Sequence, residues 1–329
     1  MLKDPFGRVI NYLRISLTDR CNMRCVYCMP ETGLSWAPSS ELLSDDQIVH
    51  IVDKAVGLGI QKIRLTGGEP LVRPGILTLI RRIAAIQGIQ DLSLTTNAYS
   101  LENMAASLVE AGLKRVNISL DTLDKDKFKR ITRQGEFEHV WRGILAAERV
   151  GLSPIKLNAV IVRGLNSDEL PALASLTIDH PWQVRFIEIM PIGNTQEWGY
   201  GFPAPDTRYF SVQEMRSSLE EFNMVPIPAA TPSETARTFQ IPGASGLVGF
   251  ISPLGEHFCE NCNRLRLTAD GRLRSCLVIP TEVSLRDALQ RGEALEKYFF
   301  QAISNKPMQH NLIVSAPAGS QRGMSQIGG

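Results

Sequence analysis

The chain has 329 residues, of which 43% are hydrophobic and 21% are charged, and its formal net charge is +1. A generic nucleic-acid or membrane-surface binder would carry a basic excess, which this chain lacks. No apolar stretch approaches the ~18 residues of a membrane span, and the first residues show no signal-peptide core. We therefore expect a cytoplasmic globular protein with no nucleic-acid or membrane partner, whose cysteines bind metal rather than each other.

Six short runs rich in β-branched residues recur in the first 190 residues, and helical patterns separate them. The predicted strands are 12–17, 62–66, 91–95, 115–120, 155–161 and 184–189, and helices are expected to begin near Asp45, Pro74, Leu101, His139 and Asp168. Strands alternating with helices every ~25–35 residues indicate a parallel sheet with helices outside it. Six units are fewer than the eight of a closed barrel, so we predict an α/β fold with an incomplete (βα)6 barrel.

Two helix starts carry capping signals. Ser44 is followed three residues later by Gln47, and Ser167 precedes two acidic residues, so each serine is a candidate N-cap. The pattern changes after Pro203, where a helix over 212–222, a proline-rich stretch over 226–232 and a helix over 285–302 are expected. We predict two domains, 1–222 and 223–329, with the smaller C-terminal domain closing the open side of the barrel.

Three cysteines, Cys21, Cys25 and Cys28, follow the first predicted strand with the spacing Cys-x-x-x-Cys-x-x-Cys. Three thiolates on one loop can hold three corners of a cubic iron–sulfur cluster, which leaves the fourth iron open to a small molecule. An open coordination site is typical of a catalytic metal centre. A zinc site would need a fourth ligand nearby, and the nearest histidine is the distant His50, so chance clustering remains the main alternative.

A second triplet, Cys259, Cys262 and Cys276, contains the remaining cysteines. A zinc site that takes His257 as its fourth ligand is one interpretation. The alternating Arg264 and Arg266 favour another, because an open cluster beside an anionic substrate would use two arginines on one face.

The remaining polar motifs come at the carboxyl ends of the predicted strands, where parallel α/β folds place their active sites. Basic residues occur at seven strand or motif positions, which are Arg14, Lys62, Arg64, Lys156, Arg185, Arg264 and Arg266. Ordinary solvated surface charge is the alternative, but Arg14 and Arg64 alternate with apolar residues inside strands. Several arginines in one cavity would predict a small, highly anionic substrate.

The cysteine loop with Tyr27 and the later Gly67-Gly68-Glu69-Pro70 resemble the two signatures of radical S-adenosylmethionine enzymes. Four longer segments, 13–21, 63–70, 185–190 and 259–266, make nearly the whole chain similar to the family of GTP 3′,8-cyclases, which act in the first step of molybdenum cofactor biosynthesis. The terminal Gly328-Gly329 also resembles the double-glycine tail of that family.

The resemblance implies a radical S-adenosylmethionine barrel with two 4Fe-4S clusters, ligated by the two cysteine triplets. S-adenosylmethionine is reduced to methionine and a 5′-deoxyadenosyl radical, which removes a hydrogen from carbon 3′ of GTP. The ribose radical then attacks carbon 8 of guanine, and the product is (8S)-3′,8-cyclo-7,8-dihydroguanosine 5′-triphosphate. By the same resemblance, the open iron of the second cluster binds the guanine base, and S-adenosylmethionine contacts Tyr27, Gly68, Ser119 and Met190. The residues implied for GTP are Arg14, Arg64, Thr95, Lys156, Arg264, Leu265 and Arg266.

Expected partners are a flavodoxin- or ferredoxin-type reductant and the downstream cyclic pyranopterin monophosphate synthase, and a homodimer is left open. We also expect the C-terminal tail to insert into the active site, with Arg322 as a catalytic residue and Gly328-Gly329 as its anchor. Two rival hypotheses stay open at this point. One is a peptide-modifying radical S-adenosylmethionine maturase with an auxiliary cluster, and the other is a zinc-stabilised binding module.

Overall fold

The computed structural model describes residues 1–192, 198–199, 201–312 and 322–328. Its centre is a parallel sheet in which six strands follow one another in chain order. These strands are β3 (Tyr12–Ser16), β4 (Lys62–Thr66), β5 (Asp91–Thr96), β6 (Arg115–Ser119), β7 (Lys156–Ile161) and β8 (Gln183–Glu188). All six predicted strands are therefore confirmed, and no strand end differs from its prediction by more than one residue.

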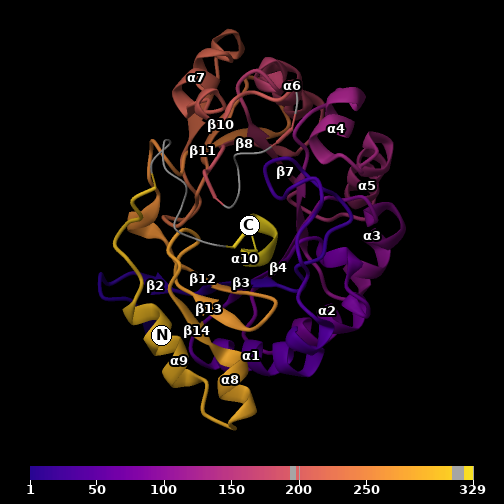
Figure 1. The fold of residues 1–329 in the computed structure, drawn as a ribbon. Coiled ribbons are helices and arrows are strands. Elements are labelled where there is room, and N and C mark those ends of the chain that lie inside the picture. Colours follow the sequence, from indigo (N-terminus) through magenta and orange to yellow (C-terminus); the bar gives the residue numbers. More distant parts are fainter. Residues whose placement is uncertain (193–197, 200, 313–321, 329) are drawn as a thin grey trace.

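Helices connect these strands and lie along the outer side of the curved sheet (Figure 1). They are α1 (Asp45–Gly57), α2 (Ile76–Ala84), α3 (Leu101–Glu110), α4 (Lys125–Thr132), α5 (Phe137–Arg149) and α6 (Leu170–Asp179). The short 3-10 helices are η1 (Ser39–Glu41), η2 (Pro70–Val72), η3 (Ser167–Glu169), η4 (Pro205–Thr207), η5 (Glu220–Phe222) and η6 (Cys259–Asn261). The open α/β barrel that the sequence predicts is confirmed.

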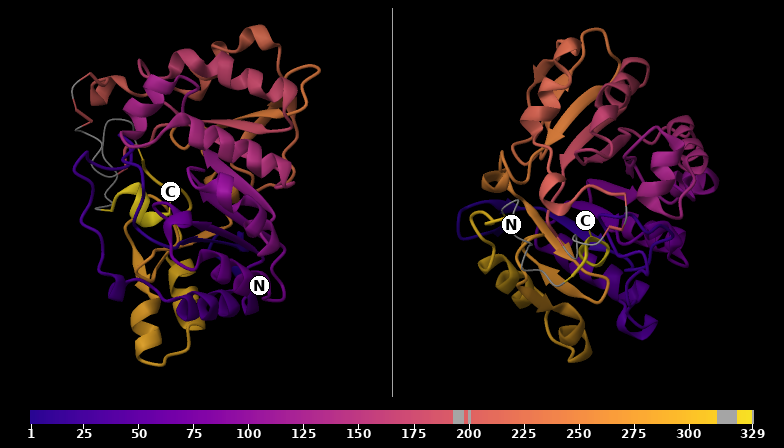
Figure 2. Two further views of the ribbon diagram at one scale, coloured as in Figure 1. Left: turned by 90° about the vertical axis from the view of Figure 1, so that its right-hand side faces the viewer. Right: turned by 45° about the horizontal axis from the view of Figure 1, so that its top comes forward.

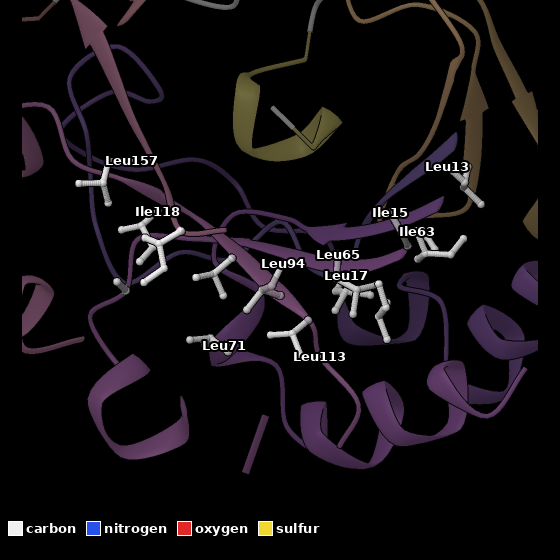
Figure 3. Packing of buried hydrophobic residues seen from close by; sticks show 14 of the residues in the cluster. Leu13, Ile15, Leu17, Ile63, Leu65, Leu71, Leu94, Leu113, Ile118 and Leu157 are labelled. Carbon is white, nitrogen blue, oxygen red and sulfur yellow. The ribbon is translucent and has the colours of Figure 1, made fainter. Parts of the chain in front are cut away.

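The hydrophobic core fills the space between the sheet and the outer helices. Leu13, Ile63 and Ile118 are fully buried and point toward this side (Figure 3). Residues alternate between the two faces of a strand, so the intervening side chains, such as Arg14 and Arg64, point to the inner side. The alternation of apolar and basic residues thus gives the sheet an apolar outer face and a polar inner face.

Of the two predicted caps, one is confirmed and the other is wrong. Ser44 Oγ accepts from the backbone N–H of Gln47 at 3.2 Å, and the Gln47 side chain accepts from Ser44 N–H at 2.9 Å. Ser167 instead begins the 3-10 helix η3, and its Oγ accepts from Gly164 N–H at 3.3 Å. Helix α6 begins only at Leu170, because the intervening turn has 3-10 rather than α-helical geometry.

The C-terminal part extends the sheet at both edges. On one side, β11 (Leu247–Ile251) runs parallel to β8, and β10 (Arg237–Gln240) and β9 (Val225–Ile227) follow it antiparallel. On the other side, β12 (Arg264–Leu267) runs parallel to β3, and β13 (Arg272–Arg274) and β14 (Glu282–Ser284) follow it antiparallel. One sheet thus runs without a break from β14 at one edge to β9 at the other. The division into two domains at residue 222 stays a prediction.

The C-terminal helices are shorter than predicted. The expected helix over 212–222 is α7 (Val212–Ser217) followed by η5, and the expected helix over 285–302 is split into α8 (Leu285–Gln290) and α9 (Glu296–Ser304). Gly292, whose φ is +66°, lies in the break between α8 and α9. The last helix, α10 (Met324–Ile327), lies inside the curve of the sheet, on the side opposite the core (Figures 1 and 2).

A separate two-stranded sheet pairs β1 (Leu2–Lys3) with β2 (Val9–Ile10) near the N-terminus. Among the described residues, the helices are all too short or too polar to cross a bilayer.

Candidate active site

A cavity of about 270 Å³ occupies the inner side of the barrel, at the carboxyl ends of the parallel strands. It brings together residues from distant parts of the chain, as the positions of the predicted motifs at strand ends require. The predicted site residues that line it are Arg14, Cys21, Cys25, Tyr27, Cys28, Arg64, Gly68, Thr95, Ser119, Met190, Arg264 and Arg266.

The first cysteine triplet forms a tight loop at the edge of this cavity. Cys28 N–H donates to the Cys25 carbonyl at 2.9 Å, and the Arg24 guanidinium donates to the Cys21 carbonyl at 2.8 Å. Burial raises the pKa of Cys21 to about 11. It also raises the pKa values of Cys25 and Cys28 well above the usual range, and repulsion from neighbouring thiolates adds to this effect. Three thiolates become stable here only beside a cationic centre, so the donor set fits an iron–sulfur cluster.

The Gly67-Gly68 turn packs directly on the backbone that leads into this loop. Gly68 N–H donates to the Thr18 carbonyl at 2.7 Å, and Glu69 N–H donates to the Arg20 carbonyl at 2.8 Å. A Cβ atom at Gly68 would lie 2.2 Å from the Arg20 carbonyl oxygen. The glycine is therefore required for contact between two loops, in addition to any contact with a ligand.

We expect Gly68→Ala to weaken S-adenosylmethionine binding, because the added methyl group pushes the turn away from the cysteine loop. Overpacking of this kind costs about 1–3 kcal/mol. Equilibrium binding of S-adenosylmethionine to the iron-loaded protein measures the effect. Gly57→Ala on α1 is the matched control, since nothing lies within 4 Å of a Cβ atom there. Equal affinities for the two variants would contradict the packing argument.

Two buried carboxyl groups, Glu69 and Asp121, also line the cavity. Neither was predicted from the sequence to be a site residue. Glu69 accepts from Thr96 Oγ1 and from Asn97 N–H, both at 2.7 Å, and burial raises its pKa to about 7. Asp121 accepts from the Tyr27 hydroxyl at 2.5 Å, and burial raises its pKa to about 6. Both follow predicted strands, and that position was the signal that could have identified them.

The Tyr27–Asp121 bond fixes the aromatic ring beside the cysteine loop. Val160 N–H donates to the other Asp121 oxygen at 2.8 Å, so the carboxylate is held from β7. The orientation of the Tyr27 phenol is thereby set by a hydrogen bond to a residue that lies 94 positions later in the chain.

A second cavity of about 180 Å³ shares Arg14, Arg64, Arg185 and Arg264 with the first. Among the described residues, its lining includes one carboxylate, Glu234, and seven cationic side chains, which are Arg14, Lys62, Arg64, Arg115, Lys156, Arg185 and Arg264. We call this second cavity the cationic pocket, and its charge is suited to a polyanion.

The cations in this cationic pocket oppose one another. Burial is the main cause that lowers the pKa of Lys156 to about 7, and repulsion from the charge of Arg185 is the next. Burial, and then Arg64, lowers the pKa of Arg185 to about 9. Arg185 is held by neutral amides, because it donates to the side-chain oxygens of Asn158 and Asn117, both at 2.8 Å. An anionic ligand would relieve this repulsion.

Sheet register explains why residues far apart in sequence converge. Arg266, Arg14 and Arg64 are direct neighbours across β12, β3 and β4, so their side chains share the inner face. Leu265 is one residue out of this row and pairs with Leu13. Its side chain is fully buried in the core and does not line the described cavities.

The second cysteine triplet lies close to the first cavity but does not line it. Phe258 and Leu277, which adjoin Cys259 and Cys276 in sequence, do line it. Burial alone would raise the pKa of Cys262, but Lys306 and Arg264 outweigh burial and lower it to about 7. A thiol that ionises so readily is suited to metal ligation.

The zinc interpretation predicted that His257 joins the three cysteines as a fourth ligand, and the structure groups His257 differently. Within the described ranges, His257, Cys259 and His310 have ligand atoms that all lie within 4.8 Å of one another. This tight group contains one cysteine only, whereas a single tetrahedral zinc ion requires all its ligands close together.

The C-terminal tail enters the cavity, where Met324 and Ser325 line its wall. An Arg266 Nη1 N–H donates to the Gly328 carbonyl at 2.5 Å. Arg322 does not line the described cavity, since it pairs with Asp270 at 2.8 Å and with Glu282 at 3.0 Å. Gly329 lies outside the described residues, so the predicted double-glycine anchor is seen only at Gly328.

Comparison with known proteins identifies the family. Residues 15–177 match the model of the radical SAM superfamily, and residues 182–312 match the model named Molybdenum Cofactor Synthesis C. The GTP 3′,8-cyclases of Alkaliphilus oremlandii and Moorella thermoacetica are each 46% identical to this chain over the full length of both proteins. The chain belongs to the GTP 3′,8-cyclase family. The Listeria monocytogenes member is 45% identical over 336 residues, covering 100% of this chain and 99% of its own.

Family membership brings an enzymatic class and its cofactors with it. Radical S-adenosylmethionine enzymes use a 4Fe-4S cluster and S-adenosylmethionine, and the cyclase family acts in molybdenum cofactor biosynthesis. The resemblance inferred from the cysteine, glycine and arginine motifs is thus confirmed.

Solved structures show the same fold at much lower sequence identity. Streptococcus suis SuiB bound to precursor peptide SuiA matches with a TM-score of 0.59 and 14% identity. The match covers 89% of this chain and 66% of the SuiB chain. SuiB alone gives a TM-score of 0.59 at 13% identity. These likenesses support the fold alone, while the sequence relatives favour the cyclase over the maturase hypothesis.

Proposed function

We propose that this chain converts GTP to (8S)-3′,8-cyclo-7,8-dihydroguanosine 5′-triphosphate. The observation that carries the proposal is the cationic pocket, which opens beside a cavity lined by the first cysteine triplet. A triphosphate fits the pocket by charge, and its nucleoside would then extend toward the reactive centre. The similarity to curated cyclases over the full chain length supports the same substrate.

Anaerobic incubation with GTP, S-adenosylmethionine and dithionite tests this function. We expect 5′-deoxyadenosine and a cyclised nucleotide to form together, as followed by chromatography and mass spectrometry. Formation of 5′-deoxyadenosine with GTP recovered unchanged would reject GTP as the substrate.

In this proposal, Cys21, Cys25 and Cys28 hold the first 4Fe-4S cluster, and Tyr27, Gly68, Ser119 and Met190 contact S-adenosylmethionine. The bound cluster and cofactor supply the one-electron cleavage that generates the hydrogen-abstracting radical. The chain's own part is to position the nucleotide and to exclude water. Met190, Ile187 and Ile251 contribute apolar side chains to the cavity wall.

Cys259, Cys262 and Cys276 would hold a second 4Fe-4S cluster, whose open iron would supply a ligand position for the guanine base. Arg14, Arg64, Lys156, Arg264 and Arg266 would bind the phosphates, and Leu265 could contribute only through its backbone because its side chain lies in the core. Thr95 Oγ1 lines the first cavity and is buried with no hydrogen-bond partner among the described residues. A substrate oxygen or nitrogen would satisfy it.

The affinity for GTP is expected to fall as the pH rises through 7. Lys156 has a pKa of about 7, so it is cationic below that pH and loses its charge above it. A charge-assisted bond contributes about 1.5–3 kcal/mol, which is roughly a tenfold or larger change in Kd. Calorimetric titration of GTP between pH 6 and 8.5, without S-adenosylmethionine or reductant, measures this dependence.

The matched variants are Lys156→Met and Lys156→Arg. The methionine variant should bind weakly and show only the pH dependence of GTP itself, whereas the arginine variant should keep high affinity above pH 7. A wild-type pH profile in Lys156→Met would contradict the assignment.

The tail completes the proposed site. The ion pairs of Arg322 with Asp270 and Glu282 hold the segment that leads into α10, and direct catalysis by Arg322 stays a prediction.

We expect deletion of Gly328 and Gly329, or Arg322→Ala, to reduce cyclisation sharply while the iron content and thermal stability remain. A separate peptide of the tail sequence should restore some activity to the deletion variant. Arg291→Ala, at an exposed ion pair, is the control. Normal cyclisation by the deletion variant would show that the tail is dispensable.

The proposal also includes a flavodoxin- or ferredoxin-type reductant and transfer of the product to cyclic pyranopterin monophosphate synthase, and it leaves a homodimer open.

A further inference from the structure

Lys306 is a lysine buried beneath the second cysteine triplet, with 4% of its surface exposed. Its ammonium donates to Cys262 Sγ at 3.4 Å, to the Arg264 carbonyl at 3.0 Å and to the Ser275 carbonyl at 2.6 Å. An ammonium has three donors, so these three contacts use all of them.

The three contacts join the two parts of the chain that carry the triplet. Arg264 begins β12, two residues after Cys262, and Ser275 immediately precedes Cys276. Lys306 itself follows α9, so one side chain ties three separate segments together. Its position is therefore fixed relative to two of the three sulfur atoms.

A second residue of the same segment lies near the third sulfur. The His310 imidazole belongs to a group with Cys259 and His257 whose ligand atoms all lie within 4.8 Å of one another. Residues 306–310 thus place one donor on Cys262 and a polar ring near Cys259, as the residues surrounding a metal site commonly do for its ligands.

The charge of Lys306 requires a negative partner. Burying an ammonium is unfavourable unless an opposite charge lies nearby. Among the described residues no carboxylate forms an ion pair with Lys306, and the two carbonyl oxygens carry only partial charge. The remaining partner is the sulfur of Cys262, which carries a formal negative charge when it is a metal ligand.

We propose that Lys306 is a positioning residue of the second cysteine triplet, which stabilises the charge of a thiolate-bound 4Fe-4S cluster and raises its reduction potential. The inference rests on the second cluster of the proposed function. Reduction adds a negative charge to the cluster, and a fixed cation at hydrogen-bond distance from a ligand sulfur favours the reduced form. Hydrogen bonds to sulfur ligands act in the same direction.

The test uses the full chain with Cys21, Cys25 and Cys28 replaced by serine, so that only the second triplet can hold iron. After anaerobic reconstitution, a potentiometric titration followed by electron paramagnetic resonance gives the midpoint potential. We expect Lys306→Met to shift this potential to a more negative value and Lys306→Arg to stay near the parent. Lys297→Met on α9 changes an exposed lysine that pairs with Glu293 and should have no effect.

Each outcome decides the proposal. An unshifted potential in Lys306→Met with a full cluster overturns it, because a merely structural lysine leaves the potential unchanged. If Lys306→Met does not retain iron, Lys306→Gln decides, since glutamine keeps donors for the carbonyls without the charge, and a parental potential there also overturns the proposal. Absence of iron from the parent itself rejects the second cluster, which is a failure of the proposed function and is distinguishable from a failure at Lys306 alone.

Discussion

Replacing any one of Cys21, Cys25 and Cys28 by serine is expected to abolish the cleavage of S-adenosylmethionine. The three thiols lie on one tight loop in the cavity, and burial opposes their ionisation unless a cationic cluster is bound. Loss of one ligand leaves two, which cannot hold a cluster with a single open iron. Formation of 5′-deoxyadenosine under reducing, anaerobic conditions measures the effect, with iron content determined on the same samples.

The control for this experiment is the second triplet, whose cysteines do not line the cavity that contains the first. Cys276→Ser removes a cysteine of the same kind and should leave cleavage measurable. Formation of 5′-deoxyadenosine at the wild-type rate by any variant of the first triplet would show that the cofactor is bound elsewhere.

Replacing Cys259, Cys262 or Cys276 by serine is expected to abolish cyclisation of GTP while slow, uncoupled cleavage of S-adenosylmethionine persists. Cys259 and Cys276 adjoin Phe258 and Leu277, which line the cavity that we propose for the nucleoside. Without the second cluster, the base would lose its anchor, and the ribose would no longer be held against the reactive centre. Product analysis and cleavage assays on one preparation separate the two effects.

Metal analysis of the same variants distinguishes this site from a zinc site. The wild-type protein should contain about twice the iron of each variant and no stoichiometric zinc, because three ligands hold each 4Fe-4S cluster in the proposed enzyme. Full cyclase activity in a variant that lacks iron at the second triplet would falsify the substrate-binding role. His257→Ala is a useful companion, since His257 lies near Cys259 and would matter to a zinc site.

The parallel strands were predictable because their signal is local. Runs such as 62–66 alternate apolar and basic residues, and β4 has the predicted ends Lys62–Thr66. Helix α4 (Lys125–Thr132) was not predicted, because its sequence is mostly charged and buries only Phe128, Ile131 and Thr132. Packing against the rest of the fold stabilises such a helix. Sequence periodicity carries no information about that packing.

The candidate site divides in the same way. Cys21, Cys25 and Cys28 were identified by spacing, since a loop ligand set is written in a few adjacent residues. Glu69 and Asp121 were missed, because a buried carboxyl group resembles an exposed one in sequence. Their burial, and the pKa shifts that follow from it, arise only when the strand ends meet.

The sequence by itself determined the two cysteine triplets, the Gly67-Gly68 turn and the order of strands and helices, because each depends on neighbouring residues. Only the tertiary structure decided which side chains meet. The register of β12 on β3 and of β3 on β4 aligns Arg266, Arg14 and Arg64, although about 250 residues separate the first two. The same long-range pairing turns Leu265 into the core and brings Lys306 onto Cys262. Contacts of this kind depend on strand pairing and packing across the whole chain, and no local pattern encodes them.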